Sequence, residues 1–191
     1  QKVGNFPGVT VSKKEAPLRG HDDFTVVDLP GIYSLSPYSA EEVVTRDFLI
    51  DEKPDVILNV VDTTQIERSL YLSIQLIEMD IPMLIALNMM DEVRLQGSHV
   101  HLEGLESRLG VPLVPISASR NEGIQELIDV TVRCARSRQK PANLDLCSGP
   151  AHRSIHAIMA LMEDHALDAG LSPRYAATKL AELVLSTCRP N

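Results

Sequence analysis

Cysteine, aromatic residues and long apolar runs are all scarce in this chain of 191 residues. Its three cysteines, Cys134, Cys147 and Cys188, are odd in number and have neither zinc-finger nor CxxC spacing, which indicates free thiols in a reducing compartment. The longest strongly apolar run, residues 81–90, is interrupted by a proline and an asparagine and is far too short to cross a bilayer. We therefore predict neither a membrane span nor a signal peptide in these residues.

Positive charge is also in deficit, because 18 Lys and Arg residues face 26 Asp and Glu residues and leave a net charge of −8. Such a chain repels a phosphate backbone instead of gathering one, so we expect no nucleic acid partner. Hydrophobic residues make up 44% of the chain, which is enough for one good core and a small second one. The composition therefore predicts one main domain with an appendage.

Four apolar segments of the chain each end in a polar residue. The four end residues are Asp28, Asp62, Asn88 and Ser117. Their steps of about 30 residues are typical of strand–helix–strand units whose parallel strands present polar side chains at one edge of a sheet. Ligands of open α/β sheets bind at that carboxyl edge. Asp62 precedes two threonines and a helical pattern, so helix capping is its better interpretation.

Helical periodicity fills the intervals between these segments. The predicted helices of the main domain cover residues 39–50, 66–77, 102–109 and 123–138. Ser39 and Glu42 form a capping box at the first helix, and Gly110 stops the third. Residues 1–8 contain two glycines and a proline and predict a loop. Residues 9–14 alternate weakly and predict an edge strand, antiparallel to the strand that ends at Asp28.

The sequence predicts three parts. They are an α/β domain over residues 1–138, a linker over 139–150 and a small all-helical domain over 151–191. Two apolar stripes at helical spacing support the last part, and Ser172 with Pro173 begins its second helix. Two helices of this length cannot bury both faces alone. We therefore expect them to pack against the main domain or to complete a bundle with material beyond Asn191.

Asp28 and Gly31 form the pattern DxxG after the first apolar segment. The carboxylate can hold a magnesium-bound water, and the glycine amide can approach a terminal phosphate without a side chain in the way. Alone this pattern is weak, because a strand-end aspartate that caps a turn has the same form. Thr10 lies before the edge strand, where its hydroxyl could reach Mg²⁺ once a phosphate holds the loop, although a surface threonine is commoner.

Asn88 and Asp91 form the pattern NxxD one strand before Ser117 and Ala118. A guanine ring presents a ring N–H and an exocyclic amino group side by side, so one carboxylate can accept both, whereas adenine offers no such pair. Asp91 would therefore select the base, while Ser117 and Ala118 supply backbone amides near the guanine carbonyl oxygen. Each motif alone could be a helix cap or a turn. The ordered set on successive strands is much harder to produce by chance.

These motifs resemble the N-terminal cytoplasmic GTPase domain of the ferrous iron transporter B family, FeoB. The resemblance rests on residues 3–11 (VGNFPGVTV), 27–35 (VDLPGIYSL), 60–68 (VVDTTQIER), 87–91 (LNMMD) and 174–180 (RYAATKL). Met89 stands where most small GTPases have lysine, which makes the resemblance specific to this family. The last stretch resembles the family's helical domain, which stabilises the GDP-bound form. Departures from the family at Phe6, Ser12, Gln65 and Ser69 lie outside the nucleotide motifs.

The resemblance implies a P-loop-GTPase-like three-layer α/β fold and a GTP-hydrolysing switch that regulates ferrous iron uptake at the cytoplasmic side of the cell membrane. It implies that Thr10, Asp28 and Gly31 are catalytic, that Thr10 and Asp28 hold Mg²⁺, and that backbone carbonyls of Gly4, Asn5 and Phe6 hold K⁺. The implied contacts to GTP or GDP are Gly8, Val9, Thr10, Asp28, Leu29, Pro30, Gly31, Asn88, Met89, Asp91, Ser117, Ala118 and Ser119. Other implied partners are the transporter's own membrane domain and, as an open alternative, a second copy of the chain.

One motif of the family is missing, because no GxxxxGK[ST] and no Gly-Lys pair occurs in these residues. In the family this phosphate-binding loop and its strand lie just upstream of Gln1, so we expect an internal piece of a longer protein. The alternative is a GTPase-like module without turnover that serves only protein contacts. His99 and His101 could be a metal pair, but two histidines without a third ligand are more often part of a solvated loop.

Overall fold

The computed structural model describes residues 2–6 and 12–187. The chain forms two compact units, Gln1–Lys53 and Pro54–Asn191. The predicted division into parts over 1–138 and 151–191 differs from these units and stays a prediction. None of the helices in the described residues combines the length and apolar character needed to cross a membrane.

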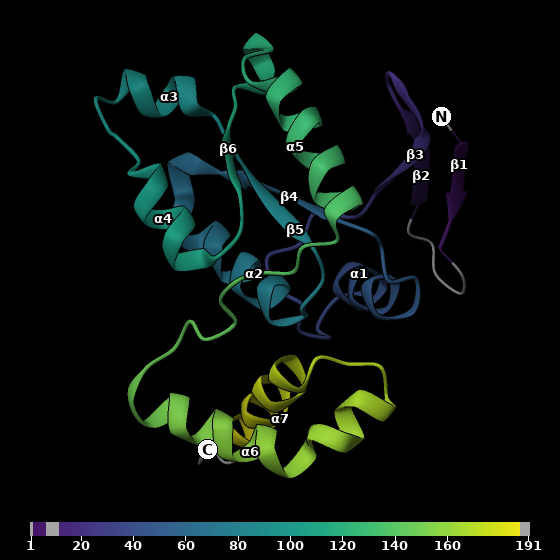
Figure 1. Cartoon of the computed structure of the whole chain (residues 1–191), viewed down its shortest axis with the longest axis vertical. Coiled ribbons are helices and arrows are strands. Elements are labelled where there is room, and N and C mark those ends of the chain that lie inside the picture. The colour runs from purple at the N-terminus through teal and green to yellow at the C-terminus, as the bar shows by residue number, and fades with distance from the viewer. Residues whose placement is uncertain (1, 7–11, 188–191) are drawn as a thin grey trace. The chain divides into compact units, whose positions relative to one another are not determined.

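The first unit consists of an antiparallel sheet and one helix (Figure 1). Its elements are β1 (Lys2–Asn5), β2 (Ser12–Leu18), β3 (His21–Asp28) and α1 (Ala40–Asp51). The loop predicted over residues 1–8 is wrong at β1, because pairing with β2 places Gly4 opposite Lys13 and overrides the local turn composition. The strand predicted over 9–14 corresponds to β2, but its predicted place at the edge is wrong, because β2 pairs with β1 on one side and with β3 on the other.

Helix α1 begins as its sequence predicts. Ser39 Oγ accepts a hydrogen bond from Glu42 N at 3.2 Å, and Glu42 Oε2 accepts one from Ser39 N at 3.1 Å, so the capping box is confirmed. Phe48 of this helix meets the ring of Phe6 edge to face, with centroids 5.9 Å apart. The aromatic pair therefore joins the helix to the sheet within this unit.

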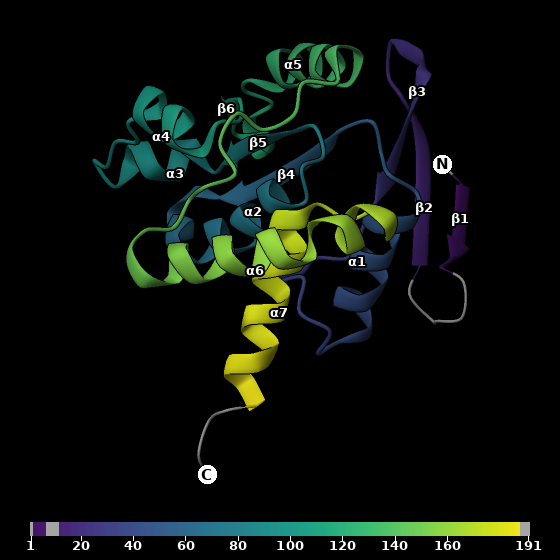
Figure 2. The same cartoon turned by 60° about the horizontal axis from the view of Figure 1, so that its bottom comes forward.

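The second unit contains a parallel sheet in the order β4-β5-β6. Its strands are β4 (Ile57–Asp62), β5 (Met83–Asn88) and β6 (Leu113–Pro115), and its helices around the sheet are α2 (Ile66–Glu78), α3 (Met90–Leu95), α4 (Leu102–Leu109) and α5 (Ile124–Ser137). Figure 2 shows α5 on one face of this sheet and α2 on the other. The central strand β5 is buried along nearly its whole length, which explains its continuous apolar run.

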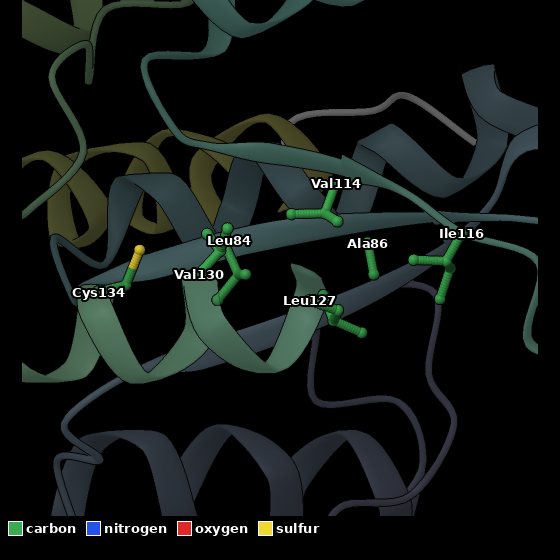
Figure 3. Packing of buried hydrophobic residues seen from close by; sticks show 7 residues of the cluster. All are labelled: Leu84, Ala86, Val114, Ile116, Leu127, Val130 and Cys134. Atoms are coloured by element: carbon green, nitrogen blue, oxygen red, sulfur yellow. The ribbon is translucent and has the colours of Figure 1, made fainter. Parts of the chain in front are cut away.

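The core on the α5 side follows from the two periodicities of strand and helix. Alternate residues of β5 and β6 meet the apolar stripe of α5, as Figure 3 shows. The residues of this cluster are Leu84, Ala86, Val114, Ile116, Leu127, Val130 and Cys134. This packing fixes the β5 and β6 ends, where the polar motifs follow.

The prediction that all four apolar segments share one parallel sheet is wrong for β3. Three of them form β4, β5 and β6, whereas β3 pairs with β2 and with no other described strand. The antiparallel hairpin occupies only one edge of β3, and no described strand lies beside the other edge to connect it to the parallel sheet. The Asp28 motif therefore belongs to the first unit and the Asn88 motif to the second.

Two further helices, α6 (Gly149–Asp168) and α7 (Pro173–Thr187), pack as a pair in the second unit. Helix α6 begins inside the linker predicted over 139–150, because Pro150 falls in the first turn, where its missing N–H is not needed. The expected packing on the main domain is found at Arg174, which pairs with Glu78 of α2 at 3.2 Å.

Candidate functional site

The carboxyl ends of β5 and β6 bring two of the sequence motifs together. Asn88, the last residue of β5, accepts a hydrogen bond through Oδ1 from the backbone amide of Ala118 at 3.1 Å. The amide of Met90 donates to the carbonyl of Ile116 at 3.2 Å. These two contacts hold the start of α3 against the loop after β6. Both amides that the sequence assigns to the guanine carbonyl are therefore used within this structure, that of Ala118 by Asn88 and that of Ser117 by the Glu122 carbonyl.

Asp91 lies in the first turn of α3 and carries the charge of the site. Its Oδ1 accepts from Ser117 Oγ at 2.6 Å, and its Oδ2 accepts from Arg120 Nε at 3.0 Å. The Ser117 hydrogen bond, with help from the nearby Arg120 charge, lowers the pKa of the Asp91 carboxyl from its usual value. Asp91 is thus an ionised acceptor at neutral pH. Arg120 was not among the predicted site residues, and its only signal in the sequence is its place two residues after Ala118.

Met89 joins β5 to α3 in a strained backbone conformation. Its φ of 64° lies in the left-handed region, which residues with a branched or long side chain seldom adopt. Such strain is concentrated at functional sites, where the surrounding structure enforces it. Met89 is 37% exposed, so it offers apolar surface to solvent between Asn88 and Asp91 in the chain.

The loop after β6 is held in one shape by its backbone. Ser117 and Glu122 exchange both amide hydrogen bonds at 3.1 Å, and the short helix η2 (Ala118–Arg120) lies between them. Gly123 has a φ of 73°, and a Cβ there would lie 2.5 Å from the Pro115 carbonyl oxygen. Only glycine fits this position, so the backbone itself fixes where the amides of Ala118 and Ser119 lie.

The neighbouring strand end has a structural role. Asp62 Oδ1 accepts from Thr64 N at 2.9 Å and from Thr64 Oγ1 at 2.7 Å, which confirms the predicted capping. His101 likewise caps α4, because its Nδ1 accepts from Gly104 N at 3.1 Å. His101 therefore has a structural role as a helix cap.

The DxxG motif lies at the end of β3 in the first unit. The Asp28 side chain is 68% exposed and has Lys14 Nζ at 3.9 Å, so its carboxylate is accessible as a hard oxygen donor and fits Mg²⁺. Gly31 is exposed, with open space where a Cβ would lie, and Leu29 and Pro30 are half-buried. No structural demand on Gly31 competes with its predicted role towards a phosphate.

The other residues predicted to bind K⁺ or the nucleotide lie near the start of the chain. Gly4 and Asn5 belong to β1 and face Lys13 and Ser12 of β2. Their carbonyls lie in or beside a hydrogen-bonded ladder, so the K⁺ assignment stays a prediction. Gly8, Val9 and Thr10 lie outside the described residues.

Comparison with known proteins decides the family. A family model described as "Ferrous iron transport protein B" (FeoB_N) matches residues 1–131. The chain belongs to the FeoB family. It is 41% identical over 189 residues to a Porphyromonas gingivalis Fe(2+) transport protein A/Fe(2+) transporter FeoB fusion protein, covering 95% of this chain and 22% of that protein. It is 48% identical over 136 residues to a Helicobacter pylori Fe(2+) transporter FeoB, covering 69% and 21%.

Solved FeoB structures have the same fold. A crystal structure of an S. thermophilus NFeoB mutant bound to mGDP matches with a TM-score of 0.87 and 40% identity, covering 94% of this chain and 68% of that one. The α/β fold with a C-terminal helical region predicted from the sequence is thereby confirmed as that of the FeoB G domain. The chain spans about a fifth of the length of the two curated FeoB relatives.

Proposed function

We propose that this chain is the GTP-binding and GTP-hydrolysing switch domain of a ferrous iron transporter, at the cytoplasmic side of the cell membrane. The observation that carries the proposal is the ionised Asp91 carboxylate, held by Ser117 at 2.6 Å where the loops after β5 and β6 meet. The mGDP-bound FeoB structure supports a guanine nucleotide as its ligand. The proposed partners are GTP or GDP and the transporter's membrane domain, with a second copy of the chain as an alternative.

The base would be selected by hydrogen bonding. A carboxylate can accept from both the ring N–H and the exocyclic amino group of guanine, and it would be left without donors by adenine. Met89 would cover one face of the base, while the Ser117, Ala118 and Ser119 backbone closes over its carbonyl edge. A buried donor or acceptor without a partner is costly, so this arrangement would discriminate strongly between bases.

The DxxG motif of the first unit is proposed to bind the phosphates. Asp28 would hold Mg²⁺ through a water, Leu29 and Pro30 would set the turn, and the amide of Gly31 would contact a terminal phosphate. Gly8, Val9 and Thr10 complete this assignment. Bound Mg²⁺ would supply charge neutralisation at the phosphates.

GTP hydrolysis in this domain would need another group to do the work of the polar side chain that follows DxxG in many small GTPases. Ile32 follows Gly31, where many small GTPases have a glutamine that orients water, and its side chain cannot polarise a nucleophile. We propose K⁺ at the carbonyls of Gly4, Asn5 and Phe6 as that substitute. The second candidate is a GTPase-like module without turnover; a GxxxxGK[ST] motif upstream of Gln1 would favour the enzyme, and its absence there would favour the module.

The base assignment is tested by exchanging the acceptor for a donor. Asp91→Asn should weaken guanine nucleotides by on the order of tenfold to a hundredfold and should favour xanthine nucleotides, because xanthine has a carbonyl in place of the amino group. Fluorescent GDP, XDP and ADP are titrated into the chain and into a version extended upstream with a phosphate-binding loop. Glu92→Gln, the neighbouring acid of α3, is the matched control.

The outcomes separate the two candidates. Unchanged GDP binding by Asp91→Asn would remove the base assignment. GDP binding without GTP hydrolysis in the extended version, in K⁺ and Mg²⁺, would favour the module without turnover. The triphosphate carries most of the ligand's charge, and the GxxxxGK[ST] loop that would bind it does not occur in these residues. We therefore expect the 191-residue chain to bind guanine nucleotides weakly.

A further inference from the structure

Four side chains with metal-binding atoms meet at the start of α6, and none of them belongs to the proposed nucleotide site. Asp145 Oδ1 lies 3.2 Å from His152 Nδ1, and Asp145 Oδ2 lies 2.9 Å from His156 Nε2. Cys147 Sγ lies 4.0 Å from His152 Nδ1. The donor atoms of Asp145, Cys147 and His152 all fall within 4.8 Å of one another.

Helix geometry explains why the two histidines act together. His152 and His156 are four residues apart, so they lie one turn apart on the same face of α6, with ring centroids 4.4 Å apart. Cys147 and Asp145 come from the chain just before the helix. The spacing His152-x3-His156 is one that zinc ligands use, and Cys147 precedes His152 by five residues. Cysteine spacing alone does not reveal this set, because histidines supply half of it.

We propose that Asp145, Cys147, His152 and His156 bind a divalent transition-metal ion, with Zn²⁺ as the best match. Tetrahedral Zn²⁺ with its usual bond lengths to sulfur, nitrogen and oxygen separates neighbouring donor atoms by about 3.3–3.6 Å. The separations of 2.9, 3.2 and 4.0 Å bracket that range. Asp145, Cys147 and His152 thus form the preassembled part of the set. His156, which contacts the other oxygen of Asp145, would complete it after a side-chain rearrangement.

The charges around the cluster suit a dication. Arg174 Nη2 donates to Cys147 Sγ at 2.9 Å, Arg174 Nη1 lies 3.0 Å from Asp145 Oδ1, and its Nε pairs with Glu78. A thiolate and a carboxylate neutralise Zn²⁺, while Arg174 and Glu78 neutralise each other. The loaded site would thus bury no uncompensated charge. The Arg174 hydrogen bond to sulfur is the kind of outer contact that orients a thiolate ligand.

The donor types decide which ions the site takes. Thiolate and imidazole favour Zn²⁺ over Mg²⁺, and Fe²⁺ and Co²⁺ would bind more weakly at the same ligands. The side chains of Asp145, His152 and His156 are 41%, 36% and 40% exposed, so an ion can enter from solvent. This site therefore differs in chemistry from the carboxylate site assigned to Mg²⁺ at Asp28.

Metal titration of the reduced, metal-free 191-residue chain tests the proposal. Zn²⁺ is titrated in competition with a chelating dye, and Co²⁺ reports sulfur ligation through a thiolate-to-cobalt charge-transfer band. We expect a single Zn²⁺ per chain. Cys147→Ser should weaken binding at least about 100-fold and abolish the band, and His156→Ala should weaken binding but keep the band.

The chain supplies its own controls. Cys134→Ala changes the buried thiol of the α5 core, and His99→Ala changes a histidine outside the cluster, so both should bind Zn²⁺ like the parent. Circular dichroism checks that every variant is folded. An absence of binding, equal loss in the control variants, a retained band in Cys147→Ser, or tighter binding of Fe²⁺ than of Zn²⁺ would each overturn the assignment. The first outcome would leave Asp145 and the histidines as salt bridges only.

Discussion

Replacing Arg174 by methionine tests the buried ion pair between α7 and α2. Arg174 is 4% exposed and Glu78 is 6% exposed, and Thr178 Oγ1 donates to the same Glu78 oxygen at 3.1 Å. Methionine keeps much of the side-chain volume but leaves Glu78 in a desolvated position without its counter-charge. We expect the helical pair to lose its main polar attachment to α2.

The size of the loss follows from burial. Removing one partner of a buried ion pair costs about 3–5 kcal/mol, because the other charge stays desolvated. For a chain of 191 residues this corresponds to a fall in Tm of roughly 6–20 °C. Arg138→Met is the matched control, since it removes an exposed pair with Asp55 whose side chains are 77% and 69% exposed, and such pairs contribute about 1 kcal/mol at most.

The pH dependence of the loss identifies the group responsible. Burial raises the pKa of Glu78, and the charge of Arg174 opposes that rise. A raised folded-state pKa contributes stability that is present below the unfolded pKa and is lost as pH rises through the folded pKa. Without Arg174 the pKa of Glu78 rises further. The stability difference between parent and variant should therefore grow from pH 5 to pH 8.

Urea unfolding followed by circular dichroism, with a metal chelator present, measures these differences. The double variant Arg174→Met with Glu78→Gln should recover part of the loss, because it also removes the stranded charge. Two results would refute the reasoning. One is a loss in Arg174→Met no larger than that in Arg138→Met, and the other is a loss that does not change with pH.

Three further predictions concern the cap, the loop and the cation. Ser34 Oγ donates to Glu42 at 2.8 Å and, with the Ser39 cap, lowers the pKa of Glu42. The stability that ionised Glu42 contributes is therefore lost as pH falls through its folded-state pKa. Glu42→Gln should flatten the acid side of the stability curve measured by thermal melts. Gly123→Ala should cost at least about 1 kcal/mol more than Gly97→Ala in urea unfolding, because both have positive φ but only Gly123 has a carbonyl 2.5 Å from the added Cβ. GTP hydrolysis by the upstream-extended version should be faster in K⁺ than in Na⁺, and equal rates would remove the K⁺ assignment.

Periodicity and strand-end residues were sufficient to predict most of the second unit. The apolar run before Asn88 predicts the buried strand β5. The predicted inward residues of α5 include Leu127 of the core cluster and Ile124, which packs against it, whereas Val130 was not among them. The prediction failed for β1, because its pairing with β2 depends on partners that follow along the chain and no local pattern encodes it. The separate sheet of β3 was missed for the same reason.

The candidate site was predictable where its chemistry lies in short motifs. NxxD and Ser117-Ala118 could be placed together because parallel strands share one carboxyl edge, and the Asn88 contact to Ala118 at 3.1 Å agrees with that placement. The contact of Arg120 with Asp91 could not be predicted, because a long side chain can reach many partners. The histidine pair on α6 was not identified from the sequence, and Asp145 joins it only through the fold.

The ion pair between Arg120 and Asp91 changes what nucleotide affinity would measure. The guanidinium occupies Oδ2 of Asp91 at 3.0 Å, so the carboxylate has a donor before any base arrives. A guanine would have to displace the Arg120 guanidinium, which donates N–H groups to the carboxylate as the base itself would. Binding would therefore be an exchange of one partner for another, with a smaller net gain than a count of base contacts suggests, and the same exchange would ease the base's departure.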